Sequence, residues 1–316
     1  MLQDFVKESG VQIVVATHAP DFMTELPVEC LTWIDRRTTE ARKTNEVGRL
    51  LAELGALSKA DAIRTCGSDK VLFLEGTFDK RLLGELFARS GSKNPFTDPQ
   101  VIVASLSNGK GDTVHLEAFR RLLRETLHLD ITLACIRDRD FDISAPSEES
   151  SEGILIATLD RKEAENYLFD PKVLAEAFRT QAGRREQRKG EQIASVTEQQ
   201  FQEQLDAILQ KPEVREKVRY QVVPQYRNSL SPDRDDSTKE QMADEWFKEQ
   251  WADPEWRICF CPGKQVLGSI RSWCQNEFGI TLTDRALCEA ITECPADIKQ
   301  VAEKITQFFY GASSQR

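Results

Sequence analysis

Short apolar runs alternate with amphipathic stretches over the first half of the chain. The run VQIVVA (11–16) reads as a short buried strand of the parallel type, ending in a polar turn at Thr17 and His18. Later apolar runs are KVLFL (70–74), QVIVASL (100–106), the start of DITLACIRDRDFD (130–142) and ILIATL (154–159). Stretches with helical spacing, such as FDKRLLGELFARSG and VHLEAFRRLLRETL, separate several of these runs. This alternation predicts βαβ units, and therefore an α/β fold around a mostly parallel sheet.

The rest of the chain carries a different pattern. ISAPSEESSEG (143–153) is rich in Ser, Glu, Pro and Gly, which predicts an exposed loop. Charged, Gln-rich sequence fills 170–254 and predicts helices with a turn at SLSPDRDDST. EWRICFC (255–261) has strand character, whereas DRALCEAITEC and ADIKQVAEKITQFF predict helices again.

Composition limits the class of protein. No apolar run approaches the ~20 residues that a membrane helix needs. MLQDFVKESG lacks the features of a secretory signal, so we expect a cytoplasmic protein with no membrane partner. Its eight cysteines are then expected to be reduced thiols. Cys259 and Cys261 would share one face of the predicted strand, but a zinc site would need two more suitably spaced ligands.

Acidic residues follow two of the predicted strands. Glu75 comes directly after the strand 70–74, and Asp79 lies one helical turn further on. Asp138 and Asp140 form a D-x-D at the end of the third strand of this unit, where an extended chain would project both to one side. Carboxyl ends of parallel strands meet at one edge of a sheet, so we expect the four carboxylates to converge there.

Converging carboxylates repel one another unless cations lie between them. Hard oxygen ligands favour Mg²⁺ or Mn²⁺, and a two-metal site can activate water and stabilise a departing oxygen. Any single acid is as well explained by helix capping or solvation; the full set favours a metal site. The net charge of −10 argues against a simple electrostatic binder of nucleic acid but not against a nuclease, because bound cations would meet the phosphate.

These motifs carry a family resemblance. VLFLEGTFDKRLL followed by CIRDRDFD resembles the Toprim signature of topoisomerases, primases and some nucleases, which have a Rossmann-like α/β fold. QIVVATHAPDFM resembles the end of an ABC-type ATPase domain, with His18 at the position of its switch histidine. An ATPase end followed by Toprim resembles the overcoming-lysogenization-defect (OLD) family of nucleases, whose role is defence against phage.

The resemblance implies three further site residues. RKEAENYLFD resembles a segment that adds acids for a second metal, which implies Glu163 and Glu165 as ligands. On a helix these two would not face each other, so an extended segment or an indirect role for one of them is required. Asn166 either orients its neighbours or caps a helix. PGKQVL resembles a motif with an essential lysine, here Lys264, although an ordinary lysine at a helix start would look the same.

The resemblance also divides the chain. Residues 1–66 are expected to be the remnant of an ABC-type ATPase domain, residues 67–169 and 255–316 the Toprim domain, and residues 170–254 a helical insertion. The chain lacks a Walker A loop, so we expect no ATP to be bound by this chain alone. Either a longer protein supplies the ATPase domain, or that domain has been lost.

The leading hypothesis is a DNA endonuclease with Glu75, Asp138 and Lys264 as catalytic residues. The same strand ends fit a non-catalytic module that binds nucleic acid or a partner ATPase. A topoisomerase would need a nucleophilic tyrosine and a primase would need template-binding modules, and no motif for either is present. Three groups of cations could contact DNA: Lys110; Arg184, Arg185, Arg188 and Lys189; and Arg215, Lys217 and Arg219. The alternative is that Lys110 lies in an ordinary turn and that the two clusters lie on solvated helix faces. Oligomeric state stays open, a homodimer included.

Overall fold

The computed structural model describes residues 12–15, 32–34, 41–43, 68–105, 116–117, 120–121, 124, 131–144, 148–190 and 192–311. The chain divides into two compact units, Met1–Ser68 and Asp69–Arg316. In the first unit, β1 (Thr32–Ile34) pairs antiparallel with β2 (Ala41–Lys43). His18 and the loop with Lys110 lie outside the described residues. No helix in the described ranges is long and apolar enough to cross a membrane.

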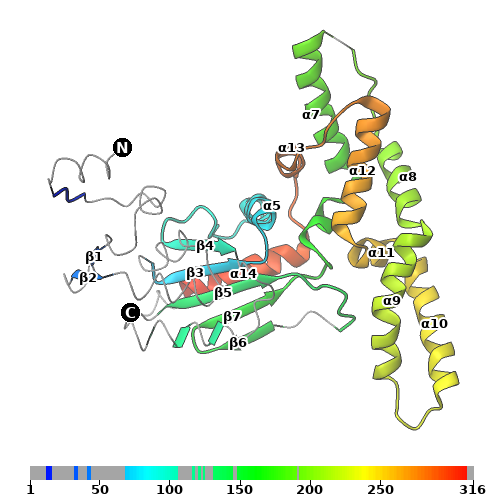
Figure 1. Cartoon of the computed structure of the whole chain (residues 1–316), viewed down its shortest axis with the longest axis horizontal. Helices are drawn as coiled ribbons and strands as arrows, with labels where there is room; N and C mark the ends of the chain where they lie inside the picture. The colour runs from blue at the N-terminus through cyan, green and yellow to red at the C-terminus, as the bar shows by residue number, and fades with distance from the viewer. Residues whose placement is uncertain are drawn as a thin grey trace. The chain divides into compact units, whose positions relative to one another are not determined.

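A five-stranded sheet in the order β4-β3-β5-β7-β6 organises the second unit (Figure 1). Its strands are β3 (Lys70–Leu74), β4 (Val101–Ser105), β5 (Thr132–Arg137), β6 (Glu148–Ser151) and β7 (Ile154–Thr158). Four strands run parallel and only β6 runs antiparallel, along β7. The predicted α/β fold with a mostly parallel sheet is therefore confirmed.

Paired residues on neighbouring strands form a row of apolar side chains across the sheet. Leu72 pairs with Val103 on one side and with Ala134 on the other, and Ala134 pairs with Leu155. All four are buried in the main hydrophobic cluster together with apolar residues of α5 (Thr77–Ala88). Both faces of β3 are covered, which explains its unbroken apolar run.

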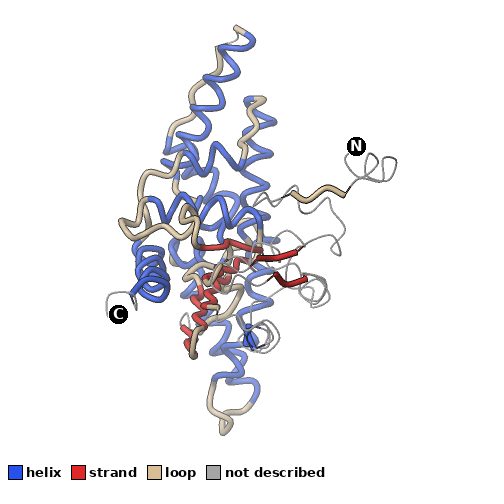
Figure 2. The backbone as a smooth tube through the Cα atoms, turned by 90° about the vertical axis from the view of Figure 1, so that its left-hand side faces the viewer, coloured by secondary structure: helices blue, strands red, loops and turns tan. Residues whose placement is uncertain are grey.

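Helices make up most of the described chain after β7. After β7 come the short 3₁₀ helix η2 (Ala164–Leu168), α7 (Pro171–Lys189), α8 (Glu198–Leu209), α9 (Pro212–Ser229), α10 (Asp236–Ala252), α11 (Pro254–Phe260), α12 (Gly263–Phe278), α13 (Asp284–Glu289) and α14 (Ala296–Tyr310). The helices predicted for 170–254 and for the C-terminal part are thus confirmed. The helices α9 and α10, labelled in Figure 1, lie side by side as an antiparallel hairpin, which Figure 2 shows at its lower end.

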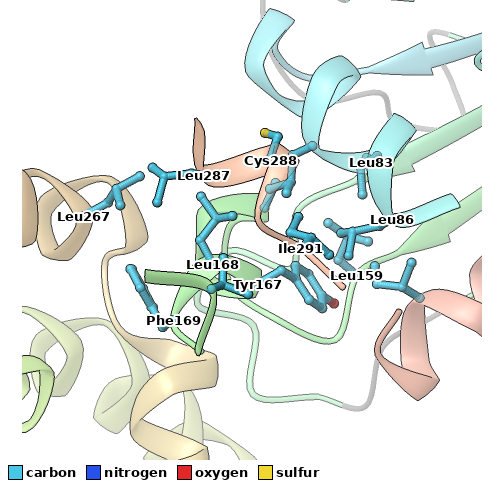
Figure 3. Close-up of a cluster of buried hydrophobic side chains, with 14 of the residues drawn as sticks. Leu83, Leu86, Leu159, Tyr167, Leu168, Phe169, Leu267, Leu287, Cys288 and Ile291 are labelled. Atoms are coloured by element: carbon cyan, nitrogen blue, oxygen red, sulfur yellow. The ribbon is translucent and has the colours of Figure 1, made fainter. Parts of the chain in front are cut away.

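Apolar side chains fix η2 between three helices. Figure 3 shows one cluster built by α5, η2 and its flanks, α12, and α13 with the turn after it: Leu83, Leu86, Leu159, Tyr167, Leu168, Phe169, Leu267, Leu287, Cys288 and Ile291. Because α5 starts at the end of β3 and η2 follows β7, this cluster holds the segments after two strands against the start of α12.

Three predictions of local structure are wrong. The predicted strand 11–16 has no strand geometry over 12–15, and Val14 is 88% exposed, since no neighbouring strand in the described residues covers it. The predicted loop contains β6, whose polar residues are held by pairing with β7 across a turn at Gly153 with a left-handed φ of 72°. EWRICFC is helical because Asp253 caps α11 by accepting from the backbone N–H of Glu255, and Pro254 occupies its first turn.

Candidate metal centre

Two neighbouring parallel strands bring their ends to one edge of the sheet. Leu74 pairs with Ile136, so Glu75 follows β3 next to the end of β5, and Asp138 follows β5 one residue beyond Arg137. One oxygen of the Asp138 carboxylate accepts a hydrogen bond from the backbone N–H of Ala164 at 3.1 Å. That bond connects the end of β5 to the start of η2.

Asp79 joins this edge from the first turn of α5. Its Oδ2 atom accepts from the backbone N–H of Gly76 at 2.7 Å, which completes the start of the helix. The side chain is only 8% exposed and is an electrostatic neighbour of Asp138. One oxygen of Asp79 thus caps α5, while the negative charge of Asp79 repels the Asp138 carboxylate at the end of β5.

Glu165 and Asn166 enter from η2, where both are buried, at 6% and 0% exposure. The Oε2 atom of Glu165 and the Oδ1 atom of Asn166 have no hydrogen-bond partner among the described residues. A buried polar atom without a partner is costly, so such an atom beside other carboxylates marks a place where a ligand would be favourable. We refer to Glu75, Asp79, Asp138 and Glu165 as the acidic cluster.

Lys264 lies beside the acidic cluster as the second residue of α12. Pro262 precedes this helix and offers no capping side chain, and the Oε2 atom of Glu163 accepts from the backbone N–H of Lys264 at 2.8 Å instead. The other oxygen of Glu163 pairs with the ammonium group of Lys162, which is 5% exposed. Both oxygens of Glu163 are therefore engaged within the chain.

The backbone at Gly263 lies against Asn166. A Cβ atom added at Gly263 would lie 2.2 Å from the Oδ1 atom of Asn166 and 3.0 Å from the Oε2 atom of Glu163, so only glycine fits. The Nδ2 atom of Asn166 donates to the carbonyl oxygens of Ile258 at 2.6 Å and Cys261 at 3.0 Å. Asn166 therefore orients its neighbours and does not cap η2, since the residue at the cap position is Glu163.

Burial and mutual repulsion raise the pKa values of three members of the acidic cluster, Asp79, Asp138 and Glu165. Burial, followed by the charges of Asp79, Glu75 and Glu165, raises the pKa of Asp138 from its usual 3.8 to about 8, against the opposing charge of Lys264. Burial also raises the pKa values of Asp79 and Glu165, again against the charge of Lys264. Without cations, protonation of Asp138 relieves part of the repulsion among these carboxylates.

The same charges act on Lys264. Burial alone would lower the pKa of its ammonium group, but the nearby carboxylates outweigh burial and raise it: Glu165, Glu163, Asp138 and Asp79. Lys264 is thus held as a cation next to the acidic cluster, whereas an ordinary lysine at a helix start would face solvent alone.

Asp140 is placed differently from the expectation. Its backbone φ is 57°, in the left-handed region, and its N–H donates to the carbonyl oxygen of Lys162 at 2.9 Å. The chain is therefore not extended at Asp140, so the extended backbone from which both carboxylates of the D-x-D were expected on one side is absent there, and a ligand role for Asp140 stays a prediction. Among the predicted ligands, Asp138 has Asp79, Glu75 and Glu165 as its strongest acidic neighbours.

The donor chemistry fits a hard divalent cation. The acidic cluster offers only carboxylate oxygens, the ligands that Mg²⁺ and Mn²⁺ prefer, and the Oε2 atom of Glu165 is one of them without a partner in the described part of the chain. Across those same residues, no three His, Cys, Asp or Glu side chains stand close enough together to enclose an ion. Ion binding would therefore require side-chain rotation within the cluster.

Several of the predicted DNA-contacting cations have partners within the chain. Arg219 pairs with Asp244 and Glu216, and Lys217 donates to Gln265 at 3.1 Å. In the other basic cluster, Arg185 donates to the carbonyl oxygen of Gly279 and Arg184 lies 3.5 Å from Glu289. Apart from the Arg219–Glu216 pair within α9, these contacts connect different helices, so these side chains are not simply solvated, and DNA contact by either cluster stays a prediction.

Three residues that support the site have no role predicted from the sequence: Arg139, Lys162 and Gly263. Asn166 was considered as an orienting residue, but nothing local indicated its contacts with residues 92 and 95 positions away. Gly263 looked like a plain turn residue. No protein-family model matches the chain, and no curated protein matches it.

Proposed function

We propose that the protein is a divalent-metal-dependent DNA endonuclease of the OLD/Toprim type. The observation that supports it best is the crowding of the buried Asp138 carboxyl by acids that follow β3 and that lie in α5 and η2, which together with burial raises the pKa of Asp138 to about 8. Ionised carboxylates from separate elements repel one another when they crowd one position, and bound cations would turn this repulsion into attraction. Glu75 after β3 and Asp138 after β5 stand where the Toprim signature would place its glutamate and first aspartate.

The residues have distinct proposed roles. The acidic cluster would hold Mg²⁺ or Mn²⁺, with Asp140 and Glu163 as further ligands that the resemblance implies. Bound cations would supply a water of lowered pKa and a positive charge facing the departing oxygen. Lys264 would offset the charge that develops on the phosphate, because the neighbouring carboxylates keep its amine protonated.

The resemblance also supplies the proposed context of the site. DNA is the proposed substrate, and an ABC-type ATPase domain, of which residues 1–66 would be the end, is the proposed partner. Residues 170–254 would be a helical insertion between the two parts of the Toprim domain, 67–169 and 255–316.

Cleavage of supercoiled plasmid tests the proposal. We expect nicked or linear product with Mg²⁺ or Mn²⁺, none with a chelator, and loss of activity in both Glu75→Ala and Asp138→Ala. Asp233→Asn, on the exposed turn between α9 and α10, is the control that should keep wild-type activity. Activity that survives both cluster substitutions would reject the endonuclease assignment.

A second candidate is a non-catalytic module that binds nucleic acid or a partner ATPase. The observation in its favour is that, in the described residues, no three potential ligands stand close enough to enclose an ion. This candidate predicts DNA binding that is the same for wild type and Asp138→Ala, with no cleavage by either. A gel-shift assay run beside the plasmid assay separates the two functions.

A further inference from the structure

The guanidinium group of Arg139, the residue between Asp138 and Asp140, contacts three separate loops. Its Nε and Nη2 atoms donate to the carbonyl oxygens of Asp142 at 2.8 Å and Ser144 at 2.6 Å, which closes the loop after β5. Its Nη1 atom donates to the carbonyl oxygen of Asp160 at 3.0 Å, in the loop after β7. A planar guanidinium with five N–H donors can make all these bonds at once, and a lysine cannot.

The third loop is reached through an aromatic ring. The Arg139 guanidinium lies over the Phe260 ring with its central carbon 4.6 Å from the ring centroid, and Phe260 ends α11 two residues before the cap of α12. Such a contact is favourable when the cation is partly desolvated. Arg139 therefore also reaches the turn that leads to Lys264.

Backbone bonds follow the same path between the loops. The N–H of Asp140 donates to the carbonyl oxygen of Lys162 at 2.9 Å, and the N–H of Lys162 donates to the carbonyl oxygen of Cys259 at 2.8 Å. The Lys162 ammonium group lies over the Phe141 ring at 4.5 Å. These three segments carry Asp138, Glu165 and Lys264, and the first and last of these residues are more than a hundred residues apart in the sequence.

We propose that Arg139 is a positioning residue that joins the loops after β5 and β7 to the turn before α12, and so sets Asp138 and Glu165 against Lys264. Its part in cleavage rests on the proposed endonuclease function; the joining of the three loops does not. Arg139 donates only to backbone carbonyls in these contacts, so it acts through the shape of the loops and not by touching substrate.

Amide hydrogen exchange on the full chain tests the joining of the loops without any need for activity. In Arg139→Lys we expect exchange at Asp140 and Lys162, and in the segment 258–262, to rise about tenfold or more, with β3 unchanged. Arg137→Lys is the matched control: Arg137 bonds Thr158 and Glu149 within the sheet, so the loop amides should stay protected. A second variant, Phe260→Leu, removes the ring and should loosen 258–262 alone.

Kinetics then test the positioning role. We expect kcat for plasmid cleavage to fall about tenfold or more in Arg139→Lys with little change in KM, because the site and not DNA binding is disturbed. Faster exchange confined to 139–144 would overturn the joining of the loops, and an unchanged kcat despite loosened loops would overturn the positioning role. A wild-type protein that never cleaves would reject the endonuclease, while the exchange results would still decide on the loops.

Discussion

The side-chain amide of Asn166 donates to the carbonyl oxygen of Cys261 at 3.0 Å, across 95 residues of sequence. It also donates to the carbonyl of Ile258, so one fully buried side chain holds the turn from which α12 starts. The position of Lys264 beside the acidic cluster thus depends on a residue of η2, the same short helix that carries Glu165.

Asn166→Asp should be strongly destabilising. The substitution removes both N–H donors and buries a charge against two carbonyl oxygens, at a cost of about 3 kcal/mol or more at neutral pH. The new carboxyl would have a raised pKa in the folded protein, so the loss should shrink as the pH falls. Urea unfolding at two pH values measures it, with Asn228→Asp, exposed on α9, as the control that stays near wild type. A stability equal to wild type would contradict the role of Asn166.

Gly263→Ala should destabilise the same junction. The added Cβ atom would lie 2.2 Å from the Asn166 Oδ1 atom, which forces α12 away from η2. We expect a loss of about 1–3 kcal/mol, typical of overpacking. Gly268→Ala on the same helix has nothing within 4 Å of its Cβ, so it should stabilise by up to about 1 kcal/mol. Thermal unfolding of the pair tests this, and losses of equal size in both would show that the close approach is not the cause.

The strands β3, β4, β5 and β7 could be predicted from local pattern, because runs such as KVLFL and ILIAT are buried on both faces and stand out in the sequence as unbroken apolar segments. Glu75 and Asp138 were placed by the rule that parallel strands end at one edge. The α11 helix was missed although Asp253 and Pro254 are capping signals, because Ile258 and Phe260 suggested a strand. The roles of Arg139 and Gly263 could not be predicted, since each rests on contacts with distant parts of the chain.

Asp138→Asn should stabilise the metal-free protein at high pH. The folded pKa of Asp138 is raised from 3.8 to about 8, so between these values the unfolded chain releases a proton that the folded protein keeps. Protonated Asp138 therefore makes its full contribution to the free energy of unfolding below about pH 4, and this contribution is lost as the pH rises to about 8. An asparagine does not titrate, so the variant keeps its stability as the pH rises, and its side-chain oxygen can still accept a hydrogen bond from the backbone N–H of Ala164.

Thermal unfolding in a chelator measures that pH dependence. At about pH 8 the variant should melt at least about 3 °C above wild type, and the difference should narrow toward about pH 4.5. Asp233→Asn, an exposed aspartate, should show no such difference. A variant less stable than wild type at the higher pH would mean that Asp138 is not crowded by other acids.

Glu163→Gln and Glu165→Gln should have opposite consequences, although the sequence treats the two glutamates alike. Glu163 is held by Lys162 and by the backbone N–H of Lys264, and its substitution would leave the buried Lys162 ammonium without its counter-charge. We expect a loss of about 3 kcal/mol in metal-free stability. Glu165 has an unpartnered Oε2 atom and a pKa raised by burial, so its substitution should leave stability equal or higher.

Mn²⁺ affinity completes that comparison. Glu165→Gln should weaken Mn²⁺ binding about tenfold or more, because a free carboxylate oxygen that faces other acids is removed, whereas Glu163→Gln should weaken it less. Calorimetric titration with Mn²⁺ gives both affinities, and urea unfolding in a chelator gives both stabilities. If Glu163→Gln loses as much Mn²⁺ affinity as Glu165→Gln and keeps its stability, then Glu163 leaves Lys162 to bind the ion, as the family resemblance implies.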